Sequence, residues 1–589
     1  MSHSSSISLS SALASALARH AGRSFGLMGT GNAHLVQGLV DLGVPYTAVR
    51  HEAGAVAAAD AYTRISGRLA IATTAYGPGF TNALTSLAEA AHARTPLLMV
   101  VGDAPTDGRR PWDVDQEMLA AALGVRTYEL KVRGIDEIVD RAVSYALRAR
   151  RPVVLAVPCD LVVAPTRSTT GPVDIQRMPS EAIDANDPAV LASLLASVAA
   201  TPTKPSISTA PTKIAPTKLQ IDNAVSALLA AERPLVLAGH GAVLACAQQE
   251  LGVIADRLGA LTATTALARN VFPRPEFDLG VSGGFAQPAA GERIASADVV
   301  VLVGASFDRV SARFRSIFGA DTKIIRIDEQ QLAAPPGVHD QRHIMLQGDA
   351  KATLQTLTGA YATAGGKSKG WRETIEGLEP GGALRVRENG LEAHPDGICA
   401  DGKLDPRAVA ARIGDILPEN IHITVDGNRS ATWPNMYWPV GSPERLIMVG
   451  STFHTIGLGI STIAGVAAAA PGTTTVLSTG DGGGLMALAD LETAVRNSQS
   501  SIIVVWNDGA YGAEVAHYGA LGLDEAPMLI PDVDFASIAN AFGARGVTVR
   551  TMLDLTALEH WIAAGATGTI LLDCRISRDI VPQSRFTAL

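Results

Sequence analysis

Residues 473–509, TTTVLSTGDGGGLMALADLETAVRNSQSSIIVVWNDG, decide the fold of this chain. Two apolar runs, each ending in a turn that contains glycine, flank a stretch with helical character. Two buried parallel strands joined by a helix have this pattern, and a right-handed crossover brings their carboxyl ends to the same edge of the sheet. We therefore predict an α/β fold whose parallel sheet carries the turns at 479–484 and 507–509 side by side.

The same alternation of apolar runs and helical stretches extends over most of the chain and divides it into three sets. Strands covered by helices on both faces appear as short, nearly continuous apolar runs. We predict three doubly wound parallel-sheet domains at 11–172, 220–360 and 401–589, with linkers at 173–219 and 361–400 and a flexible N-terminus at 1–10. The expected strands are 69–74, 97–101, 153–157, 234–238, 298–303, 323–327, 421–425, 473–477, 501–506 and 569–572.

Composition restricts the class of function. The 589 residues carry a net charge of −9, so there is no basic excess to neutralise nucleic-acid phosphates or an anionic membrane surface. The sequence shows neither a signal peptide nor a membrane-spanning run, and its four scattered cysteines lack metal-ligand spacing. We expect a cytoplasmic protein with buried thiols and with no nucleic-acid or membrane partner.

Asp481 and Asn507 follow the two strands of the opening segment. Glycines at a strand end let backbone N–H groups approach a phosphate, and the next helix N-terminus favours an anion. Asp481 and Asn507 together would supply oxygen ligands to a hard cation that bridges a diphosphate. Each residue alone is more simply a helix cap or a turn residue, but the pair favours a phosphate and cation site.

This pair of turns, with 24 residues between Gly482 and Asn507, resembles the diphosphate and magnesium motif of the thiamine diphosphate enzymes. RHEAGA at 50–55 is similar to the pyrimidine-contacting segment of that family, and YGPGFTN at 76–82 and DQE at 115–117 resemble segments of acetolactate synthases. The resemblance covers nearly the whole chain and is closest to acetolactate synthase-like 2-oxo acid decarboxylases and carboligases. It implies that the three domains are, in order, pyrimidine-binding, central and diphosphate-binding.

The resemblance assigns Glu52 to the acid that contacts the cofactor's aminopyrimidine. In this family the cofactor's own imino group, formed with the help of that acid, removes the C2 proton of the thiazolium to give a carbanion. Glu52 lies between the apolar run at 46–49 and an alanine-rich helix, so we expect a buried side chain with a raised pKa. A helix-start glutamate that interacts with the helix dipole is the plainer alternative.

The resemblance also implies residues around the diphosphate and the metal. Asp481, the side chain of Asn507 and the carbonyl of Gly509 are the expected Mg²⁺ ligands. Ile456 would support the bent cofactor beneath its two rings, and the carbonyl of His454 would accept from the 4'-amino group. The other expected cofactor-binding residues are Pro78, Asn82, Asn428, Arg429, Gly480, Gly482, Gly483, Gly484, Ala510, Tyr511 and Gly512, with Arg429 in place of the usual histidine.

Met28, Tyr76, Phe80 and Gln116 are expected to line the substrate cavity. A methionine and a phenol suit a modest apolar group, although methionine is more often plain packing. Glu514, in YGAE, stands near the position of a proton-donating carboxylate in decarboxylases of the family, and sulfoacetaldehyde acetyltransferases have a similar WGAE. A solvated helix glutamate is an equal alternative for Glu514.

Two central segments, GHG at 239–241 and GASFDR at 304–309, resemble flavin-contacting parts of acetolactate synthase. Ser306 stands where an arginine is expected. A fold that retains its turns without a nucleotide is therefore slightly favoured over bound FAD.

The leading expectation is a thiamine diphosphate and Mg²⁺ dependent carboligase that decarboxylates a 2-oxo acid such as pyruvate and transfers the acyl anion to a carbonyl acceptor. The alternatives are a benzoylformate-type decarboxylase, a sulfoacetaldehyde-type acyltransferase and, in another class, a cofactor-binding regulator, against which an intact Glu52 argues. The resemblance also implies a homodimer or homotetramer, because Glu52 and Asp481, 429 residues apart on different domains, would meet between two chains.

Overall fold

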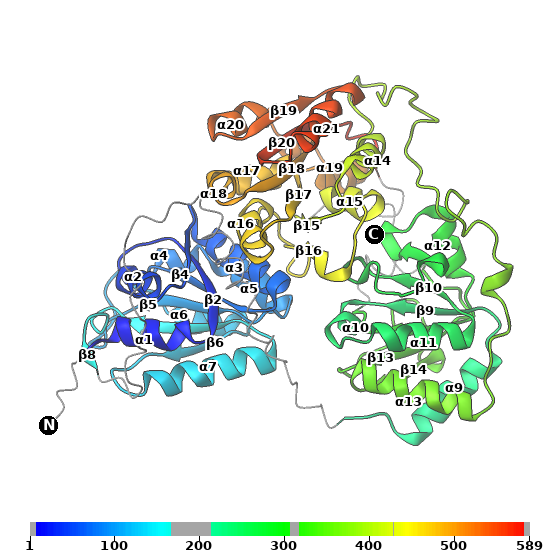
Figure 1. The fold of residues 1–589 in the computed structure, drawn as a ribbon, viewed down its shortest axis with the longest axis horizontal. Helices are drawn as coiled ribbons and strands as arrows, with labels where there is room; N and C mark the ends of the chain where they lie inside the picture. The colour runs from blue at the N-terminus through cyan, green and yellow to red at the C-terminus, as the bar shows by residue number, and fades with distance from the viewer. Residues whose placement is uncertain (1–6, 167–213, 307–316, 428, 582–589) are drawn as a thin grey trace, which may run out of the picture.

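The computed structural model describes residues 7–166, 214–306, 317–427 and 429–581. Figure 1 shows three domains, coloured blue to cyan, green, and yellow to red along the chain. Each contains a six-stranded sheet in which every strand pairing is parallel, with helices on both faces. The predicted α/β fold of three doubly wound domains is confirmed.

The N-terminal domain has the sheet order β3-β2-β4-β5-β7-β6. Its strands are β2 Ala21–Gly26, β3 Tyr46–Ala48, β4 Leu69–Thr74, β5 Leu98–Asp103, β6 Arg126–Glu129 and β7 Val153–Pro158. Its helices are α1 Leu9–Ala18, α2 Ala33–Asp41, α3 Glu52–Ser66, α4 Pro78–Thr81, α5 Leu84–His92, α6 Gln116–Ala122 and α7 Ile135–Ala149.

The central domain has the order β11-β10-β9-β12-β13-β14. Its strands are β9 Pro234–Ala238, β10 Leu261–Thr264, β11 Asp278–Val281, β12 Val299–Val303, β13 Lys323–Asp328 and β14 His343–Gln347. Its helices are α9 Lys218–Ala230, α10 His240–Leu244, α11 Gln248–Leu258, α12 Pro288–Ala295 and α13 Ala350–Thr363.

The C-terminal domain has the order β16-β15-β17-β18-β20-β19, the same scheme as the N-terminal domain. Its strands are β15 Ile421–Val425, β16 Leu446–Met448, β17 Thr474–Gly480, β18 Ser500–Asn507, β19 Arg545–Val549 and β20 Gly568–Arg575. Its helices are α14 Pro406–Ile416, α15 Thr432–Tyr437, α16 Gly459–Ala469, α17 Asp481–Met486, α18 Leu491–Asn497, α19 Gly512–Tyr518, α20 Phe535–Ala541 and α21 Thr556–Ala563. Every strand expected from the sequence overlaps one of these strands.

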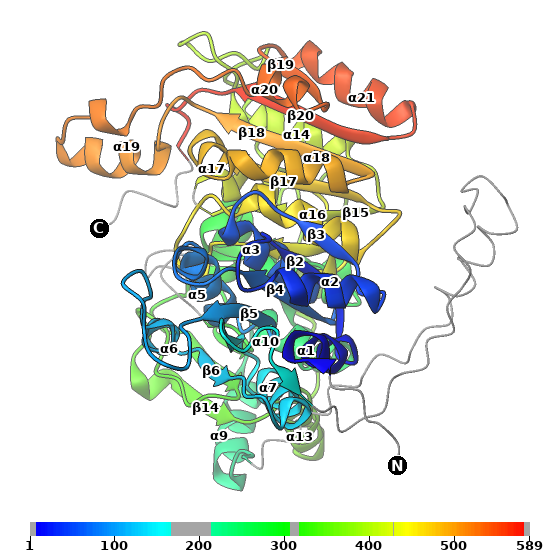
Figure 2. The same ribbon diagram turned by 90° about the vertical axis from the view of Figure 1, so that its left-hand side faces the viewer.

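Helix α3 of the N-terminal domain packs on helix α16 of the C-terminal domain (Figure 2). The two backbones approach closely, since a Cβ added at Gly465 would lie 2.1 Å from the carbonyl oxygen of Ala58. Polar contacts secure the same interface: Arg64 donates to the carbonyl of Met448 over 2.9 Å, and Glu89 accepts from the backbone N–H of Phe453 over 2.8 Å. The first and third domains of one chain are therefore joined directly.

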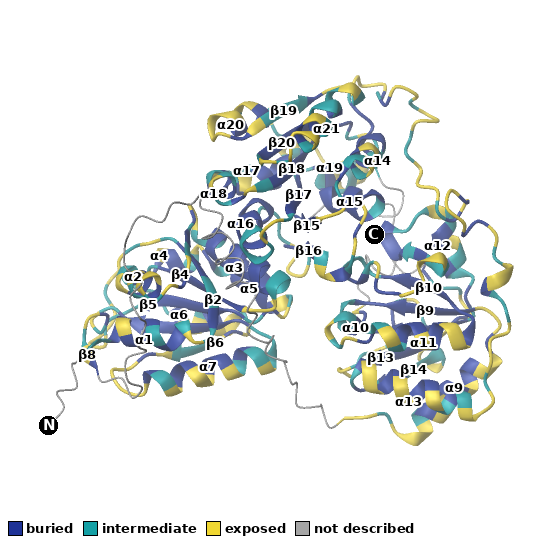
Figure 3. Cartoon of the chain, viewed as in Figure 1, coloured by how far each residue is buried: buried dark blue, intermediate teal, exposed yellow. Residues whose placement is uncertain are grey.

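Buried residues concentrate on the strands and on the inner helix faces (Figure 3). Among the cysteines only Cys399 and Cys574 are buried, whereas Cys246 is exposed and Cys159 is half-buried, so the expectation of buried thiols is wrong for the latter two. Within the described ranges, no helix has the length and apolar character needed to cross a membrane.

The expected flexible N-terminus at 1–10 is wrong for its last four residues. Ile7–Ser8, strand β1, pairs antiparallel with Pro165–Thr166, strand β8, and α1 begins at Leu9, which is fully buried. The expected linker at 173–219 lies outside the described residues except for 214–219, where α9 begins at Lys218.

The glycine-containing turns of the central domain pack on each other. Gly241 donates its N–H to the carbonyl of Gly304 over 2.8 Å, and a Cβ added at Gly239 would lie 2.5 Å from that same carbonyl oxygen. Close backbone approach accounts for these glycines without a nucleotide. Residues 307–309 of the expected flavin-contacting segment lie outside the described residues.

Candidate active site

A pocket at the carboxyl ends of β15, β17 and β18 collects many of the residues singled out in the sequence. We call it the glycine pocket. Its lining consists of Gly427, Arg429, Ser430, Trp433, Ile456, Gly480, Asp481, Gly482, Gly483, Trp506, Asp508, Ala510, Tyr511, Gly512 and Ile576. All of these belong to the C-terminal domain, and the carboxyl edge of a doubly wound sheet is where such folds bind ligands.

Asp481 lies at the first position of α17 and is 3% exposed. Its carboxylate accepts from the N–H of Gly482 and from the N–H of Gly509, both over 2.9 Å, so it connects the turn after β17 to the turn after β18. Burial, and next the neighbouring Asp508 carboxylate, raise the pKa of Asp481 to about 7. A bound cation would reverse this penalty by stabilising the charged form.

In this structure the side-chain amide of Asn507, the expected partner of Asp481, is engaged outside the glycine pocket. Asn507 does not line the glycine pocket; its amide donates to the Asp573 carboxylate over 2.9 Å and to the carbonyl of Val533 over 3.2 Å. Asp508, which was not among the site residues expected from the sequence, lines the pocket beside Asp481. Trp506, the last residue but one of β18, also lines this pocket, whereas Asp508 lies just beyond the end of the strand. The strand pattern in the sequence therefore gave no signal for Asp508.

The backbone carbonyl of Gly509 is the third expected metal ligand. Its carbonyl accepts from the N–H of Ile530 over 2.8 Å, and its φ of 72° lies in the left-handed region that favours glycine. Gly509 therefore shapes the turn that presents its N–H to Asp481.

The glycines of the pocket are required by close packing. A Cβ added at Gly482 would lie 2.7 Å from the ring of Tyr511, and one added at Gly483 would lie 2.7 Å from the Asp426 carboxylate. Gly484 instead faces Phe535, outside the pocket, so its expected cofactor contact is not supported.

Arg429 lines the glycine pocket but its guanidinium is engaged by protein groups. It pairs with Asp508 over 3.4 Å and donates to the carbonyls of Gly512, Arg578 and Ile580. The ion pair with Asp508 compensates the second carboxylate of the pocket, and the contact of Arg429 with a diphosphate stays a prediction. Asn428, the neighbouring expected ligand, lies outside the described residues.

Ile456 lines the glycine pocket and is half-buried, in the position expected of an apolar support. The adjacent N–H of Gly457 donates to the buried Asp426 carboxylate over 3.2 Å, which fixes the loop. His454 has a φ of 58°, a left-handed conformation that orients its backbone, and its side chain is exposed.

Glu52 begins α3 in the N-terminal domain and is half-buried in this chain, not buried as expected. Glu52 is the first residue of α3, at the edge of the domain, so part of its side chain stays exposed. The side-chain amide of Asn82 donates to the Glu52 carboxylate over 3.0 Å, and Gly79 lies close to it. The turn at 77–82, in which Pro78 is exposed at the start of α4, thus orients Glu52.

Two of the four expected cavity residues have other roles. The Gln116 amide accepts from the N–H of Gly77 and donates to the carbonyl of Gly102 and to Asp103, each over 2.9 Å. Gln116 therefore fixes the turn at Gly77 to the end of β5. Phe80 is fully buried in the domain core. Tyr76 is half-buried with the Arg110 guanidinium 4.3 Å from its ring centre, and Met28 is 56% exposed. The last two remain available to a ligand.

Glu514 lies on α19 and is half-buried. Its Oε2 atom is buried and has no hydrogen-bond partner in the described part of the chain. A carboxylate oxygen in that state is not the solvated helix glutamate that the sequence offered as an alternative.

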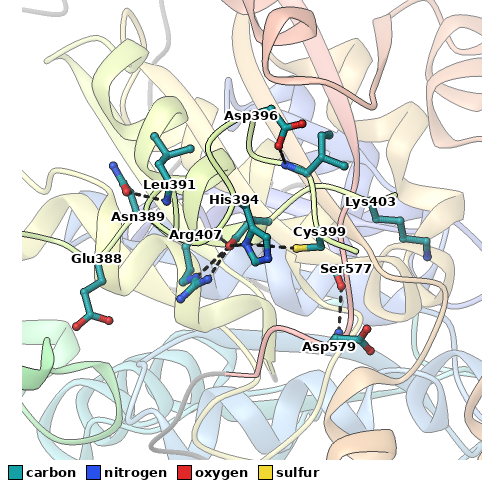
Figure 4. A network of polar contacts seen from close by, with 12 residues as sticks. Glu388, Asn389, Leu391, His394, Asp396, Cys399, Lys403, Arg407, Ser577 and Asp579 are labelled. Carbon is teal, nitrogen blue, oxygen red and sulfur yellow. Dashed lines mark hydrogen bonds and ion pairs between the residues drawn. The ribbon is translucent and has the colours of Figure 1, made fainter. Parts of the chain in front are cut away.

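One group of metal-ligand type forms that the cysteine spacing does not reveal. His394, Cys399 and Asp405 bring their ligand atoms within 4.8 Å of one another (Figure 4). Asp405, however, is fully buried, caps α14 and pairs with the Arg407 guanidinium over 2.7 Å. The carboxylate is already neutralised, so this cluster fixes the loop that leads into α14.

Three family profiles match this chain, one in each domain. Profiles described as "Thiamine pyrophosphate enzyme" match as an N-terminal TPP binding domain at 7–123, a central domain at 221–357 and a C-terminal TPP binding domain at 427–574. The chain belongs to the thiamine pyrophosphate enzyme family. It is therefore an enzyme dependent on thiamine diphosphate.

Relatives within this family carry different activities. The chain is 26% identical to a probable 2-ketoarginine decarboxylase of Pseudomonas aeruginosa, covering 94% of this chain and 90% of the relative. It is 26% identical to a probable acetolactate synthase large subunit of Methanocaldococcus jannaschii, covering 88% and 84%. It is 24% identical to a sulfoacetaldehyde acetyltransferase of Alcaligenes xylosoxydans, covering 93% and 90%.

Among solved structures, a thiamine diphosphate-dependent 4-hydroxybenzoylformate decarboxylase of Rhodococcus jostii has a TM-score of 0.71 at 20% identity and covers 97% of this chain and 99% of its own. That likeness concerns the fold.

The residues of this chain suit the family's cofactor. Two buried carboxylates that share a pocket repel each other unless a cation lies between them, and three glycines line the same pocket beside the start of α17. This arrangement fits a diphosphate bridged by a divalent metal ion.

Proposed function

We propose that this enzyme uses thiamine diphosphate and Mg²⁺ to decarboxylate a 2-oxo acid and to transfer the acyl unit to a carbonyl acceptor, as an acetolactate synthase does. The glycine pocket carries the proposal, because it pairs two buried carboxylates with a glycine-lined turn at the edge of a parallel sheet. When bound, the cofactor would supply the electron sink that such a decarboxylation needs.

Asp481 and Asp508 would hold the metal ion in this proposal. Both carboxylates line the pocket, and Asp481 is oriented by two backbone N–H groups. Arg429 would keep Asp508 in place and offset its charge. Asn507 would act from the opposite face, where its amide fixes the end of β18 against Asp573.

Glu52 would hold the proton that activates the pyrimidine. Asn82 donates to its carboxylate and so sets the direction in which the other oxygen points. Gln116, with its amide engaged by the turn at Gly77, would position the segment and not contact the substrate. Of the four expected cavity residues, Tyr76 and Met28 would contact the acyl group.

A plain decarboxylase that releases an aldehyde is the second candidate, and Glu514 favours it. Protonation of the acyl unit requires an acid near the reacting carbon. Glu514 follows the pocket residue Gly512 by two positions and has a buried oxygen without a partner. A carboligase must keep that same proton away until the acceptor has reacted.

The proposal includes a homodimer. Among the residues that the structure describes, those lining the glycine pocket all come from the C-terminal domain, and Glu52 is not one of them. Loops of that domain expose apolar side chains, with Met28 56% and Trp112 59% exposed. A second copy that seats its N-terminal domain against the pocket would cover these side chains and complete the site.

The test measures CO₂ release and identifies the products from pyruvate, benzoylformate and longer 2-oxo acids, with and without thiamine diphosphate and Mg²⁺. A carboligation product supports the first proposal, and an aldehyde alone supports the second candidate. In a separate assay that supplies sulfoacetaldehyde and inorganic phosphate, formation of acetyl phosphate with release of sulfite would instead make the enzyme an acyltransferase. The Asp481→Ala variant serves as the control for cofactor dependence.

Binding of the cofactor without turnover of any 2-oxo acid would overturn the proposal in favour of a regulator. The visible absorption spectrum of the purified protein decides in the same preparation whether a flavin is bound.

A further inference from the structure

A second pocket lies beside the turn that carries Asp508. We call it the basic pocket. It is lined by Gly402, Lys403, Asn507, Asp508, Gly509, Leu529, Ile530, Asp532, Arg550, Arg575 and Arg578. Asp508 is the one lining residue that it shares with the glycine pocket. The two pockets therefore lie on either side of a single turn.

The charges of this pocket are not balanced. Four cationic side chains line it against the two carboxylates of Asp508 and Asp532. Arg575 is satisfied, because it pairs with Asp532 and, over 2.7 Å, with Asp573. The Asp508 carboxylate is likewise engaged by Arg429. Both anions thus have partners of their own.

The other three cations, Lys403, Arg550 and Arg578, form no ion pair within the described part of the chain. They come from three separate segments: the loop before α14, the end of β19 and the chain after β20. Like charges that converge on one hollow repel one another, and a bound anion removes that repulsion.

We infer that the basic pocket is a binding site for a small anion bearing a phosphoryl group. Two planar guanidinium groups and an ammonium group provide the donors that phosphate oxygens accept, and paired arginines favour such an anion over a single carboxylate. The net charge of the lining side chains matches an anion with about two charges. The inference does not depend on which reaction the enzyme catalyses.

The site is connected to the turn beside the metal carboxylates. Lys403 donates to the backbone carbonyl of Asp508 over 3.4 Å, and the carbonyl of Arg578 accepts from Arg429 over 2.8 Å. Figure 4 shows Lys403 on the loop that also carries His394 and Cys399, with Ser577 and Asp579 of the chain after β20 close by. An anion in the pocket would thus contact Lys403, which binds the backbone of Asp508, and Arg578, which binds the Asp508 partner Arg429.

The experiment titrates inorganic pyrophosphate, and separately inorganic phosphate, into the enzyme saturated with thiamine diphosphate and Mg²⁺, with calorimetry as the readout. Saturation fills the glycine pocket, so that only a second site remains. We expect one site per chain, with an affinity at least tenfold weaker in the Arg550→Gln/Arg578→Gln double variant. Arg148→Gln/Arg545→Gln, which removes two exposed arginines elsewhere, is the matched control and should bind as the unmutated enzyme does.

Three results would overturn the inference. Equal affinity in the double variant and in the unmutated enzyme would place the anion elsewhere. Displacement of the anion by additional thiamine diphosphate with Mg²⁺ would show that the basic pocket belongs to the cofactor. Displacement by a 2-oxo acid would assign it to the substrate. Circular dichroism of the double variant shows whether the protein remains folded.

Discussion

Asp508 and Asn507 are neighbours in the chain and both line the basic pocket, but of the two only Asp508 also lines the glycine pocket. Asp508 points into the glycine pocket and pairs with Arg429, whereas Asn507 donates to Asp573 on the far side. A pocket with a second carboxylate needs a compensating cation when the metal ion is absent. Arg429 supplies that cation through its ion pair with Asp508.

Single substitutions of Asp508 and of Asn507 by alanine distinguish the roles of the two residues. We expect Asp508→Ala to weaken Mg²⁺-dependent binding of thiamine diphosphate by roughly tenfold or more, because one carboxylate ligand is lost. Asn507→Ala should affect this affinity less and instead lower the free energy of unfolding by about 1–3 kcal/mol, because Asp573 loses a buried hydrogen bond. Calorimetric titration and denaturant unfolding of both variants provide the comparison. A larger loss of affinity in Asn507→Ala would restore it as the ligand.

Glu52→Gln keeps the size of the side chain and the contact with Asn82 but removes the titrating proton. We expect the C2 proton of the bound cofactor to exchange roughly 10²–10⁴ times more slowly, with cofactor affinity nearly unchanged. Quenched NMR measures the exchange directly. Glu137→Gln, an exposed glutamate on α7, serves as the control. Exchange at the unmutated rate in Glu52→Gln would remove Glu52 from the mechanism.

Spacing predicts which turns of the sequence meet, but not which side chain of a turn enters the pocket. Asp481 stands out because it interrupts a run of glycines. Asp508 directly follows the more conspicuous Asn507. The role of Gln116 depends on Gly77 in one turn and on Gly102 and Asp103 at the end of β5. Such contacts are set by tertiary packing, which a local pattern does not contain.

At the scale of elements, the contact between α3 and α16 determines where Glu52 stands, because Glu52 is the first residue of α3. Ala58 and Gly465 are in backbone contact across the two helices. Small residues allow helices to approach this closely, and any added atom must push them apart.

Gly465→Ala and Gly359→Ala form a matched pair. A Cβ at Gly465 would lie 2.1 Å from the Ala58 carbonyl oxygen, so we expect a loss of about 1–3 kcal/mol in the free energy of unfolding and a lower activity. Gly359 is exposed within α13 with nothing within 4 Å of the added atom, so alanine there should stabilise by about 0.5–1 kcal/mol. Denaturant unfolding measures both. Equal effects would argue against the close helix contact.

His422 on β15 gives the C-terminal domain a pH dependence. Burial, and next the charge of Arg445, lower the pKa of His422 to about 4 from its ordinary 6.5. The unfolded chain takes up a proton below about pH 6.5, whereas the folded chain does so only near pH 4, so stability falls as the pH drops through this window.

We expect His422→Gln to reduce this loss of stability on acidification relative to the unmutated enzyme. Thermal unfolding across the window measures it, and His560→Gln, an exposed histidine on α21, is the control. An unchanged pH dependence in His422→Gln would show that other groups are responsible.

The main strands could be predicted from the sequence because buried parallel strands are continuous apolar runs with clear boundaries. The pairing of β1 with β8 could not be predicted. Each strand has only two residues, and the paired residues Ile7 and Thr166 are 159 positions apart, so only tertiary contacts align them.

At the scale of the whole molecule, the N-terminal and C-terminal sheets have the same strand order, and the central sheet has another. The two similar domains hold complementary halves of a site: Glu52 with its orienting turn on one, and the glycine pocket on the other. Within one chain they are joined through α3 and α16, and none of the described N-terminal residues lines the glycine pocket. We therefore propose that two chains together complete each site.

Mixing two inactive variants tests this arrangement. A dimer formed from one Glu52→Gln chain and one Asp481→Ala chain has one site with both residues intact and one with both altered. Under conditions of subunit exchange, activity should recover to about one quarter of the unmutated level, because about half of the dimers are mixed and each has one working site. Activity should also fall on dilution as dimers dissociate. Native mass spectrometry confirms that exchange has occurred. If exchange is complete and no activity returns, Glu52 and Asp481 act within a single chain and the proposed assembly is wrong.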